Sequence, residues 1–404
     1  MDGEVDFDQI RNSFRKWSLS TEHNDPRREE VLGSSLVCID SVWRRRKLLE
    51  LKACRKSGFE FGDSHFFLRK WSQRSVVMSM KSLVLLFLPI CLLLCQCVSN
   101  GIGYTRGGSD AGGEAYLTVE AHSGRVVSRY NAIATRPVGS LSQVATAVVA
   151  FDWSTATGQS LSQQAIVPPN ALSIGGVNPM GLQAGDQIPL RDALYSMLMG
   201  SDSISAQTVA VFVGNQLQIQ RGRRSGSVEN TFVDEMNQLA GSLGMRRTRF
   251  VDAHGNGRST STAEDLARLS IYAMRHPGMA FYTEQKTRSI GYSRAGQSFS
   301  FRVSNTNNLV GQQGINGLKA GQTQLSGPCL IVSAERKPLV EKLADGQSRI
   351  TPRRMIAVVL NSGQRDARAL GLLQQGWAAY DQIQTQGAVA GTLPQDVLSV
   401  PSLR

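Results

Sequence analysis

The chain has 404 residues, of which 41% are hydrophobic, and it carries a formal net charge of +12. A chain of this length and composition can bury a large core, and its length indicates two or three structural units. The basic excess lies in spread arginines without an aromatic stacking set or a recognition motif, which argues against a nucleic-acid partner and favours an anionic envelope polymer or membrane surface. None of the five histidines is spaced as a ligand pair, so the sequence predicts no metal site.

The first part of the chain reads as a leader rather than a domain. Residues 1–79 mix basic and acidic side chains without a sustained helical or strand period. The segment that starts at Met80 has one basic residue and then an apolar run over residues 83–95, which has the length of a secretory signal core and is too short to span a bilayer. We therefore predict a signal peptide over residues 80–99. Residues 1–79 are interpreted as an over-extended gene start, and the alternative is a disordered cytosolic extension before a short signal anchor.

Cysteine usage agrees with a leader that is removed. Cleavage after Ser99 would leave Cys329 as the only thiol, so the sequence gives no sign of a disulfide framework. Cys95 and Cys97 each follow a leucine by three residues, which makes a bacterial lipoprotein signal with a lipid anchor the alternative to soluble export. The residue directly before each cysteine is not small, and this fits such a signal poorly.

Downstream of the leader, residues 100–114 are rich in glycine and polar residues and are predicted to form a linker. Two strand-like runs, 116–121 and 125–129, flank a His-Ser-Gly turn and predict a β-hairpin. Residues 144–153 are apolar on every side, so periodicity alone does not distinguish a buried helix from a buried strand.

The second half alternates helical and strand patterns. Apolar residues recur at helical spacing over residues 231–243, and Gly244 follows as a stop signal. Ser261 and Glu264 have the spacing of a capping box, which predicts a helix through Ala273. Further predictions are strands over residues 329–334 and 355–360 and a last helix whose apolar face contains Leu370, Leu373, Trp377, Tyr380 and Ile383.

Three short polar patterns follow one another along the chain. They are Ser140-Leu141-Ser142-Gln143, Ser201-Asp202-Ser203 and Lys319-Ala320-Gly321. Together they resemble the Ser-x-x-Lys, Ser-x-Asn and Lys-Thr-Gly elements of the penicillin-binding serine D-alanyl-D-alanine carboxypeptidases, although each is altered. The run from Met236 to Gly255 is the most specific match to this family.

The resemblance covers about residues 115–385 and leaves 386–404 as a C-terminal tail. It implies a mixed α/β domain of the β-lactamase/transpeptidase-like type. In such a domain an antiparallel sheet is flanked by helices, a helical subdomain carries Ser201, and the site lies in the cleft between them. The helix interpretation of residues 144–153 also follows from this resemblance.

By the same resemblance, Ser140 occupies the position of the nucleophile, and Gln143 stands where the family keeps its general-base lysine. An amide cannot take up a proton near neutral pH, so Gln143 can hydrogen-bond Ser140 but cannot activate it. From the residues alone, an ordinary helix N-cap is the favoured interpretation of Ser140, and the order of the three motifs favours the nucleophile position instead. His254 is a tempting substitute base, but its place in the family pattern favours a packed, hydrogen-bonded histidine.

The other site residues keep part of the family's chemistry. The resemblance implies that Ser201 relays the proton to the leaving group and that Lys319 binds the terminal carboxylate of the substrate. Ser203 and Ala320 replace an asparagine and a threonine that position substrate. The resemblance also implies that Gly321 and Gln322 bind substrate, with the Gln322 and Ser140 N–H groups as the oxyanion hole. From the residues alone, Lys319 could open a plain β-turn, and the Ser201 motif could be a helix-terminal cluster.

The resemblance therefore implies an exported, peptidoglycan-directed protein of the bacterial cell envelope, periplasmic or extracellular, that cleaves or binds the terminal D-Ala of stem peptides. β-Lactams are further expected ligands, and no cofactor or metal is implied. Catalysis is predicted to be impaired. The alternative is a non-catalytic module that binds D-Ala-D-Ala peptides or a protein partner. A β-lactamase is a weaker third hypothesis, because it also needs the missing lysine. Membrane contact is expected only through the signal or a lipid anchor.

Overall fold

In the computed structural model the chain divides after Gly103, and every described residue lies in the second unit, residues 104–404. The signal peptide, the extension before it and most of the linker lie outside the described residues. No described helix has both the length and the apolar character needed to cross a membrane. In the same part of the chain, no group of His, Cys, Asp and Glu side chains could hold a metal ion. The described residues are 113–222, 225–343, 346–386 and 397–403.

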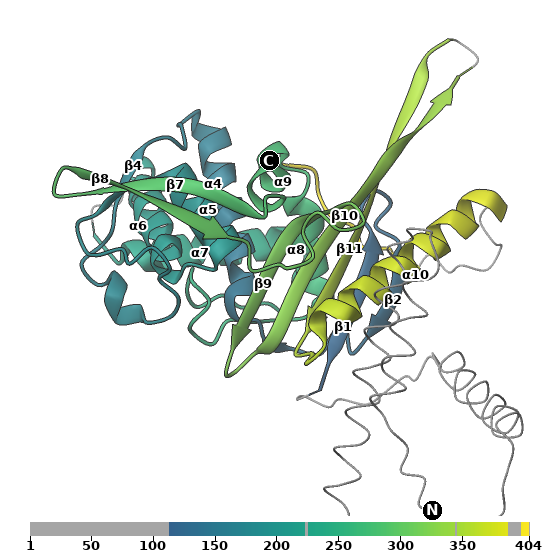
Figure 1. The fold of residues 1–404 in the computed structure, drawn as a ribbon, viewed down its shortest axis with the longest axis horizontal. Coiled ribbons are helices and arrows are strands. Elements are labelled where there is room, and N and C mark those ends of the chain that lie inside the picture. The colour runs from purple at the N-terminus through teal and green to yellow at the C-terminus, as the bar shows by residue number, and fades with distance from the viewer. Residues whose placement is uncertain (1–112, 223–224, 344–345, 387–396, 404) are drawn as a thin grey trace, which may run out of the picture. The chain divides into compact units, whose positions relative to one another are not determined.

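A five-stranded antiparallel sheet forms the centre of the second unit (Figure 1). Its strands, in spatial order, are β2 (Val126–Tyr130), β1 (Ala115–Glu120), β11 (Ser348–Leu360), β10 (Gly327–Lys342) and β9 (Ile315–Thr323). β9 pairs on one side only, so one of its edges is free within this sheet. This free edge becomes important because β9 carries Lys319.

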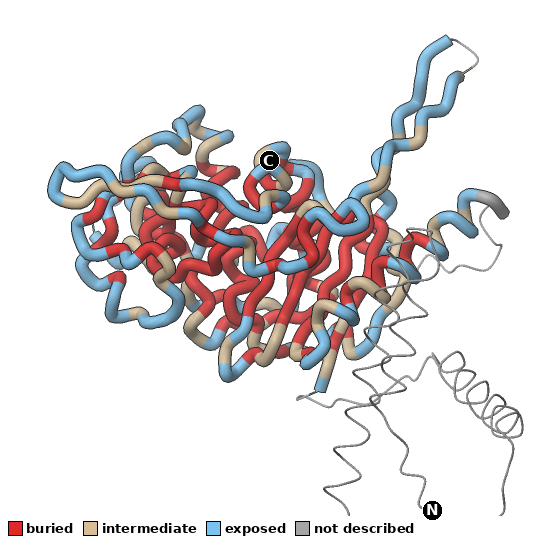
Figure 2. The backbone as a smooth tube through the Cα atoms, in the orientation of Figure 1, coloured by how far each residue is buried: buried red, intermediate tan, exposed pale blue. Residues whose placement is uncertain are grey.

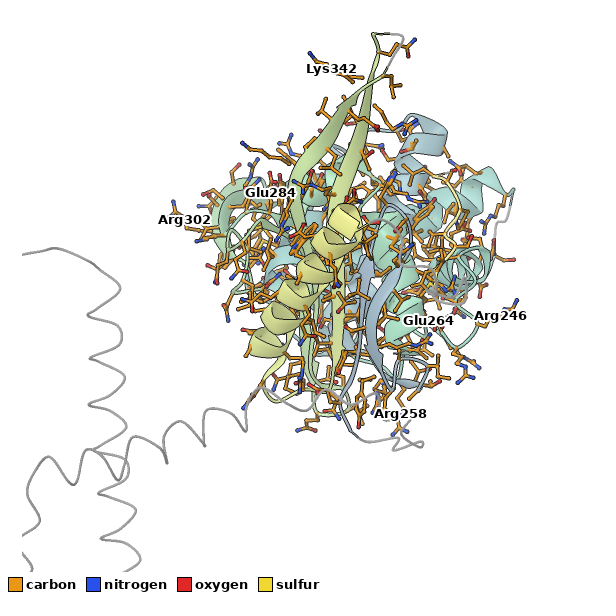
Figure 3. All side chains as sticks on the ribbon, turned by 90° about the vertical axis from the view of Figure 1, so that its right-hand side faces the viewer. Arg246, Arg258, Glu264, Glu284, Arg302 and Lys342 are labelled. Carbon is orange, nitrogen blue, oxygen red and sulfur yellow. The ribbon has the colours of Figure 1, made fainter. Side chains whose placement is uncertain are left out.

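Both faces of the sheet are buried, as the predominantly apolar strands require (Figure 2). Helix α10 (Arg365–Gln386) lies across one face, where Trp377 packs with alternate residues of β10 and β11 such as Val332 and Val359 (Figure 3). On the other face, residues such as Val358 and Ile331 join the core formed by the remaining helices. The packing of the last helix onto the sheet is as predicted.

The helical part of the unit packs against that second face. It begins with the short 3₁₀ turn η1 (Gly139–Ser142), which runs directly into the buried helix predicted for residues 144–153. The helices are α4 (Gln143–Thr157), α5 (Leu190–Gly200), α6 (Ser203–Gln220), α7 (Val228–Ser242), α8 (Ala263–Ala273) and α9 (Pro277–Thr283), with a second 3₁₀ turn, η2 (Ala171–Ile174). The mixed architecture, an antiparallel sheet with flanking helices and a helical region, is the predicted one.

Two small sheets complete the unit. The first pairs β3 (Arg136–Pro137) with β6 (Thr260–Ser261), which joins the chain before η1 to the chain before α8. The second contains β4 (Gln164–Ile166), β5 (Gln187–Pro189), β7 (Thr287–Arg294) and β8 (Gln297–Ser304), in that order. β3–β6 therefore fixes the segment immediately before Ser140.

Several boundaries differ from the predictions. β10 and β11 are much longer than residues 329–334 and 355–360, because they continue past the sheet as a two-stranded hairpin. The N-cap of α8 is Thr262 rather than Ser261, since the Thr262 side chain accepts the Asp265 N–H at 3.0 Å. Residues 397–403, predicted as tail, return to the domain, where Leu398 is buried and its N–H donates to Gly124 O at 2.7 Å.

Candidate active site

Ser140 lies at the entrance to the central helix. It is the second residue of η1, and its side chain is 5% exposed. The N-cap of α4 is Ser142, and Val138 precedes η1 as its cap, so Ser140 caps neither element. The interpretation of Ser140 as an ordinary N-cap is therefore wrong. Within the described residues its Oγ makes no hydrogen bond, which leaves the hydroxyl free to react or to bind.

Two glycines let neighbouring backbones approach Ser140. A Cβ atom on Gly255 would stand 2.5 Å from Gly139 O and 2.7 Å from Ser140 Cα, and the Gly255 φ is +85°. From the other side, a Cβ on Gly321 of β9 would stand 3.3 Å from Ser140 N. A larger residue at position 255 would push the backbone of η1 away, whereas one at 321 would need small adjustments.

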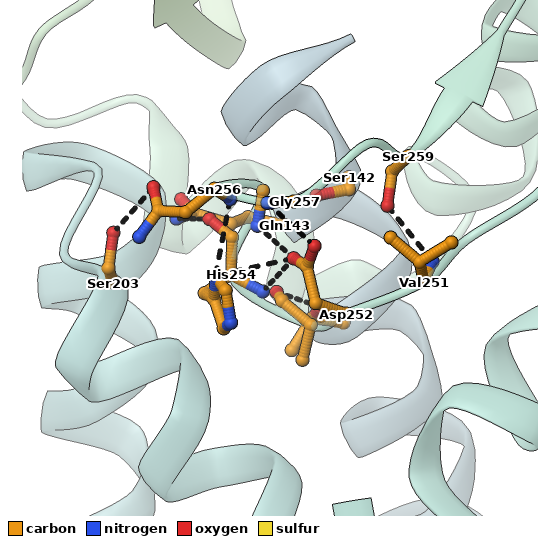
Figure 4. Close-up of polar contacts among 12 residues, drawn as sticks. Ser142, Gln143, Ser203, Val251, Asp252, His254, Asn256, Gly257 and Ser259 are labelled. Carbon is orange, nitrogen blue, oxygen red and sulfur yellow. Dashed lines mark hydrogen bonds and ion pairs between the residues drawn. The ribbon is translucent and has the colours of Figure 1, made fainter. Parts of the chain in front are cut away.

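Gln143 is fully buried and faces the turn that contains His254 (Figure 4). Its Nε2 donates to the backbone carbonyl of His254 at 2.9 Å, and its Oε1 is buried without a hydrogen-bond partner. The amide thus makes a donor contact of the kind that an ammonium also makes, but it has no basic lone pair to accept a proton.

Asp252, which lies within the family-like run over residues 236–255, organises the turn over residues 252–257. The Asp252 carboxylate accepts the N–H groups of His254, Gly255 and Gly257. His254 Nδ1 accepts the Asn256 N–H at 3.2 Å, which favours the neutral imidazole, and burial lowers the His254 pKa. This is the packed, hydrogen-bonded histidine that the sequence favours.

Ser203 is occupied by contacts within the protein. Its N–H donates to Val177 O at 2.7 Å, its Oγ accepts the Val177 N–H at 3.2 Å, and the same hydroxyl donates to Asn256 Oδ1 at 3.4 Å. Asn256 in turn reaches Gly175 O through its Nδ2 at 2.9 Å. Ser203 therefore links α6 to the turn over residues 252–257 instead of presenting a free amide-like group to a ligand.

Ser201 and Asp202 form the junction between α5 and α6. Ser201 ends α5 with φ +60° and ψ +28°, a left-handed conformation that is uncommon outside glycine and is frequently found at functional sites. Asp202 caps α6, where its carboxylate accepts from Ile204 N, Ser205 N and the hydroxyls of Ser196 and Ser205. Burial raises the Asp202 pKa. The helix-terminal role considered for this motif applies to Asp202, and the Ser201 hydroxyl is left without a bond among the described residues.

Lys319 lies in the middle of β9, opposite Ile331 of β10, and its side chain is completely buried. Its interpretation as a β-turn entry is wrong. The ammonium donates to Ala320 O at 2.5 Å, and no carboxylate of the described residues pairs with it. Burial, and then the charge of Arg365, lower the Lys319 pKa to about 7. A buried cation without a counter-ion is a ready partner for a ligand anion.

The three residues after Lys319 fall into different environments. Ala320 is buried in the apolar cluster under α10, and Gly321 faces Ser140. Gln322 is exposed and stands opposite Pro328, which has no N–H to give to a ladder. In an antiparallel pair this favours the non-hydrogen-bonded arrangement, which directs the Gln322 N–H to the free edge of β9. That is the direction an oxyanion-hole donor needs.

Arg365, the first residue of α10, is a site residue that the sequence did not reveal. Its Nη1 donates to Gly321 O at 3.0 Å and to Cys329 O at 3.3 Å. It therefore joins the strand that carries Lys319 from 44 residues away in the sequence. Only the fact that α10 starts beside the end of β9 places this second cation there.

Comparisons with known proteins show relatives of this chain in sequence and in fold. The family model described as D-alanyl-D-alanine carboxypeptidase matches residues 105–343. The chain is 27% identical over 251 residues to the D-alanyl-D-alanine endopeptidase of Pseudomonas aeruginosa, covering 60% of this chain and 73% of the relative. The corresponding Escherichia coli endopeptidase is 26% identical, with the same coverage. The solved Streptomyces K15 DD-transpeptidase superposes with a TM-score of 0.55 at 23% identity, covering 68% of this chain and 99% of that one, and shows the same fold.

The clearance at position 255 can be tested by stability. Gly255→Ala places a methyl group against the backbone of Gly139 and retains a positive φ, so it should lower the free energy of unfolding by about 2–4 kcal/mol. Gly244→Ala is the matched control, because Gly244 has φ +72° but open space around its Cβ direction. It should cost about 1–2 kcal/mol. Urea denaturation followed by circular dichroism measures both, and equal losses would contradict the close approach to η1.

Proposed function

The chain belongs to the D-alanyl-D-alanine carboxypeptidase family, and from this premise we propose that it is an exported envelope protein that binds peptidoglycan stem peptides ending in D-Ala-D-Ala beside Ser140. We propose further that it cleaves them very slowly or not at all. The observation that carries the second part is Gln143, a buried amide fixed to the His254 carbonyl at the general-base position.

The chemistry of peptide-bond cleavage explains this assignment. A serine hydroxyl is a weak nucleophile until a neighbouring base removes its proton. Loss of a general base alone costs about 10²- to 10⁴-fold in rate, and the loss approaches roughly 10⁶-fold where nucleophile and base act as a unit. His254 does not replace the base, because its Nδ1 already accepts the Asn256 N–H.

Ligand binding does not require a general base, and the chain keeps the charged groups and the backbone donor that binding requires. Lys319 supplies a buried positive charge, Arg365 of α10 supplies a second cation bonded to the same strand, and Gln322 supplies a backbone donor at the free edge. A peptide carboxylate would give Lys319 the counter-ion that the described protein residues do not provide. β-Lactams, which resemble the same peptide ending, are the second ligand class of this proposal.

The alternative function is a binding module that has lost catalysis altogether and holds D-Ala-D-Ala peptides or a protein partner in the same cleft. The contacts of Ser203 favour it, since its hydroxyl is committed to Val177 and Asn256. The two functions differ in one measurable property, a residual covalent reaction at Ser140.

The carboxylate site predicts a dependence on charge and on pH. Wild type should bind a D-Ala-D-Ala peptide acid more tightly than its amide. The peptide carboxylate stays ionised above pH 5, whereas Lys319 loses its proton as the pH rises through about 7. Affinity for the acid should therefore fall by up to about tenfold between pH 6 and pH 8, and affinity for the amide should stay constant. Isothermal titration calorimetry at both pH values measures this.

Lys319→Met removes the charge at nearly the same side-chain length and is the matched control. It should abolish the preference for the acid and its pH dependence. A preference that survives Lys319→Met and does not vary with pH would assign the carboxylate to Arg365 instead. Equal binding of acid and amide would rule out carboxylate recognition at this site.

The lost base predicts a gain of reaction. A labelled penicillin should acylate wild type very slowly or not at all, and Gln143→Lys should raise the rate by about 10²-fold or more. A lysine buried there, near the positive Lys319, would have its pKa lowered enough to act as a base. Ser203→Asn and Ala320→Thr should help only when combined with Gln143→Lys, because groups that act as a unit are non-additive. Intact-protein mass spectrometry follows the adduct over time.

Gln143→Met is the matched control, since it changes the same buried position without supplying a base, and it should not accelerate acylation. Ser140→Ala should remove every adduct. Wild-type acylation as fast as that of Gln143→Lys would show that another group supplies the base. An adduct on a residue other than Ser140 would refute the nucleophile assignment.

Export is tested separately from the chemistry. The single basic residue and apolar run after Met80 lead us to propose that the mature protein begins at Cys95 or later. Intact-mass analysis of the protein from its native cells should then find no residue before Cys95, and a lipid-modified N-terminal cysteine would distinguish a lipoprotein from soluble export. Peptides from residues 1–79 in the mature protein would contradict the proposal.

A further inference from the structure

The hairpin formed by β10 and β11 continues well beyond the central sheet (Figure 1). β9 stops pairing with β10 at Ala334, and β1 stops pairing with β11 at Met355. Past these points the two strands pair only with each other, as far as Lys342 opposite Ser348. We call this extension, residues 335–354 without 344 and 345, the arm.

The base of the arm is fixed to the rest of the domain. The Arg336 guanidinium lies 4.3 Å from the centre of the Trp377 ring and pairs with Asp381 of α10 at 2.9 Å. On the other strand, Arg354 pairs with Glu335 at 2.6 Å and donates to Ser333 Oγ at 2.7 Å. These contacts hold the arm in a defined direction while its outer half stands in solvent (Figure 2).

The edges of the arm are poorly suited to accept another strand. Pro338 and Pro352 have no N–H to donate, and the pairing register shifts between Arg336 and Leu339. Proline, irregular pairing and charged side chains are the devices by which natural sheets avoid edge-to-edge association. A partner of the arm is therefore expected to contact its side chains rather than extend its ladder.

One face of the outer arm combines apolar and basic side chains. Val340 and Ile350 are direct cross-strand partners, so they share a face, and they are 62% and 64% exposed. Lys342 follows two residues after Val340 on the same face, and its side chain stands at the outer end of the arm (Figure 3). Residues 337–353 contain four basic and two acidic residues, and one of the acidic residues, Glu341, lies 3.4 Å from Arg349.

We propose that this face of the arm docks on an anionic lipid surface, with Val340 and Ile350 entering the headgroup boundary and Lys342 close to the lipid phosphates. Val340 and Ile350 lie side by side at the most exposed part of the arm, so burial of this pair in an apolar layer is favourable. A specific protein interface needs about 800 Å² from each partner, which one aliphatic pair on a narrow ribbon does not supply. A lipid surface needs only a small apolar wedge and an excess of positive charge.

The test is hydrogen–deuterium exchange of the full chain, read peptide by peptide, with and without vesicles. Because the readout is local, lipid binding by other parts of the chain does not obscure the arm. Vesicles containing phosphatidylglycerol should slow exchange of the arm amides by about tenfold, and pure phosphatidylcholine vesicles should not. The β7–β8 hairpin, which is also partly exposed, should exchange at an unchanged rate. High salt should reverse most of the protection.

Variants separate the arm from general charge effects. Val340→Asp combined with Ile350→Asp should abolish the protection, and Lys342→Glu should reduce it by about fivefold. Ile219→Asp is the matched control, since Ile219 is an equally exposed aliphatic residue (62%) on α6, and it should change nothing at the arm. Unchanged arm exchange with anionic vesicles would overturn the proposal. Arm protection that depends on protein concentration without lipid would also overturn it, and would assign the face to a second copy of the chain.

Discussion

Ser140 is held between two backbone segments that reach it because each carries glycine at the point of closest approach. Gly255 brings the turn over residues 252–257 against η1, and Gly321 brings the free-edge strand β9 against the same residue from the other side. The bonds that converge on this point come from α4, α6 and the turn, through Gln143 and Asn256. If either backbone moved outward, the turn with Gly255 and the strand that carries Lys319 would no longer meet at Ser140.

A lysine can both donate a hydrogen bond and accept a proton, whereas Gln143 can only donate a hydrogen bond to the turn. Its Nε2 donates to the His254 carbonyl, which connects α4 to the turn over residues 252–257. Its Oε1 has no partner, and a buried unsatisfied acceptor costs about 1–3 kcal/mol. At this position the protein therefore has a hydrogen-bond donor to the turn and no proton acceptor.

The rest of the domain sets the charge environment of Lys319. Burial penalises its charge, and Arg365 at the start of α10 adds a second positive charge instead of a counter-ion. The same α10 holds the base of the arm through Trp377 and Asp381. One helix thus contacts both the strand of the candidate site and the hairpin proposed to meet a lipid surface, and its packing on the sheet fixes both.

The sequence by itself determined the elements whose apolar residues repeat regularly, such as the helix over residues 231–243 and the hairpin around residue 122, because burial of one face leaves a periodic trace. It also determined the altered motif residues, since their chemistry is set by residue type. Only the tertiary structure placed Lys319 inside a strand, because residues 317–321 lack the alternation of apolar and polar side chains that predicts one. It alone brought Arg365 to Gly321 and Asn256 to Ser203, across 44 and 53 residues. Such contacts arise from the packing of separate elements, and no local pattern in the chain records them.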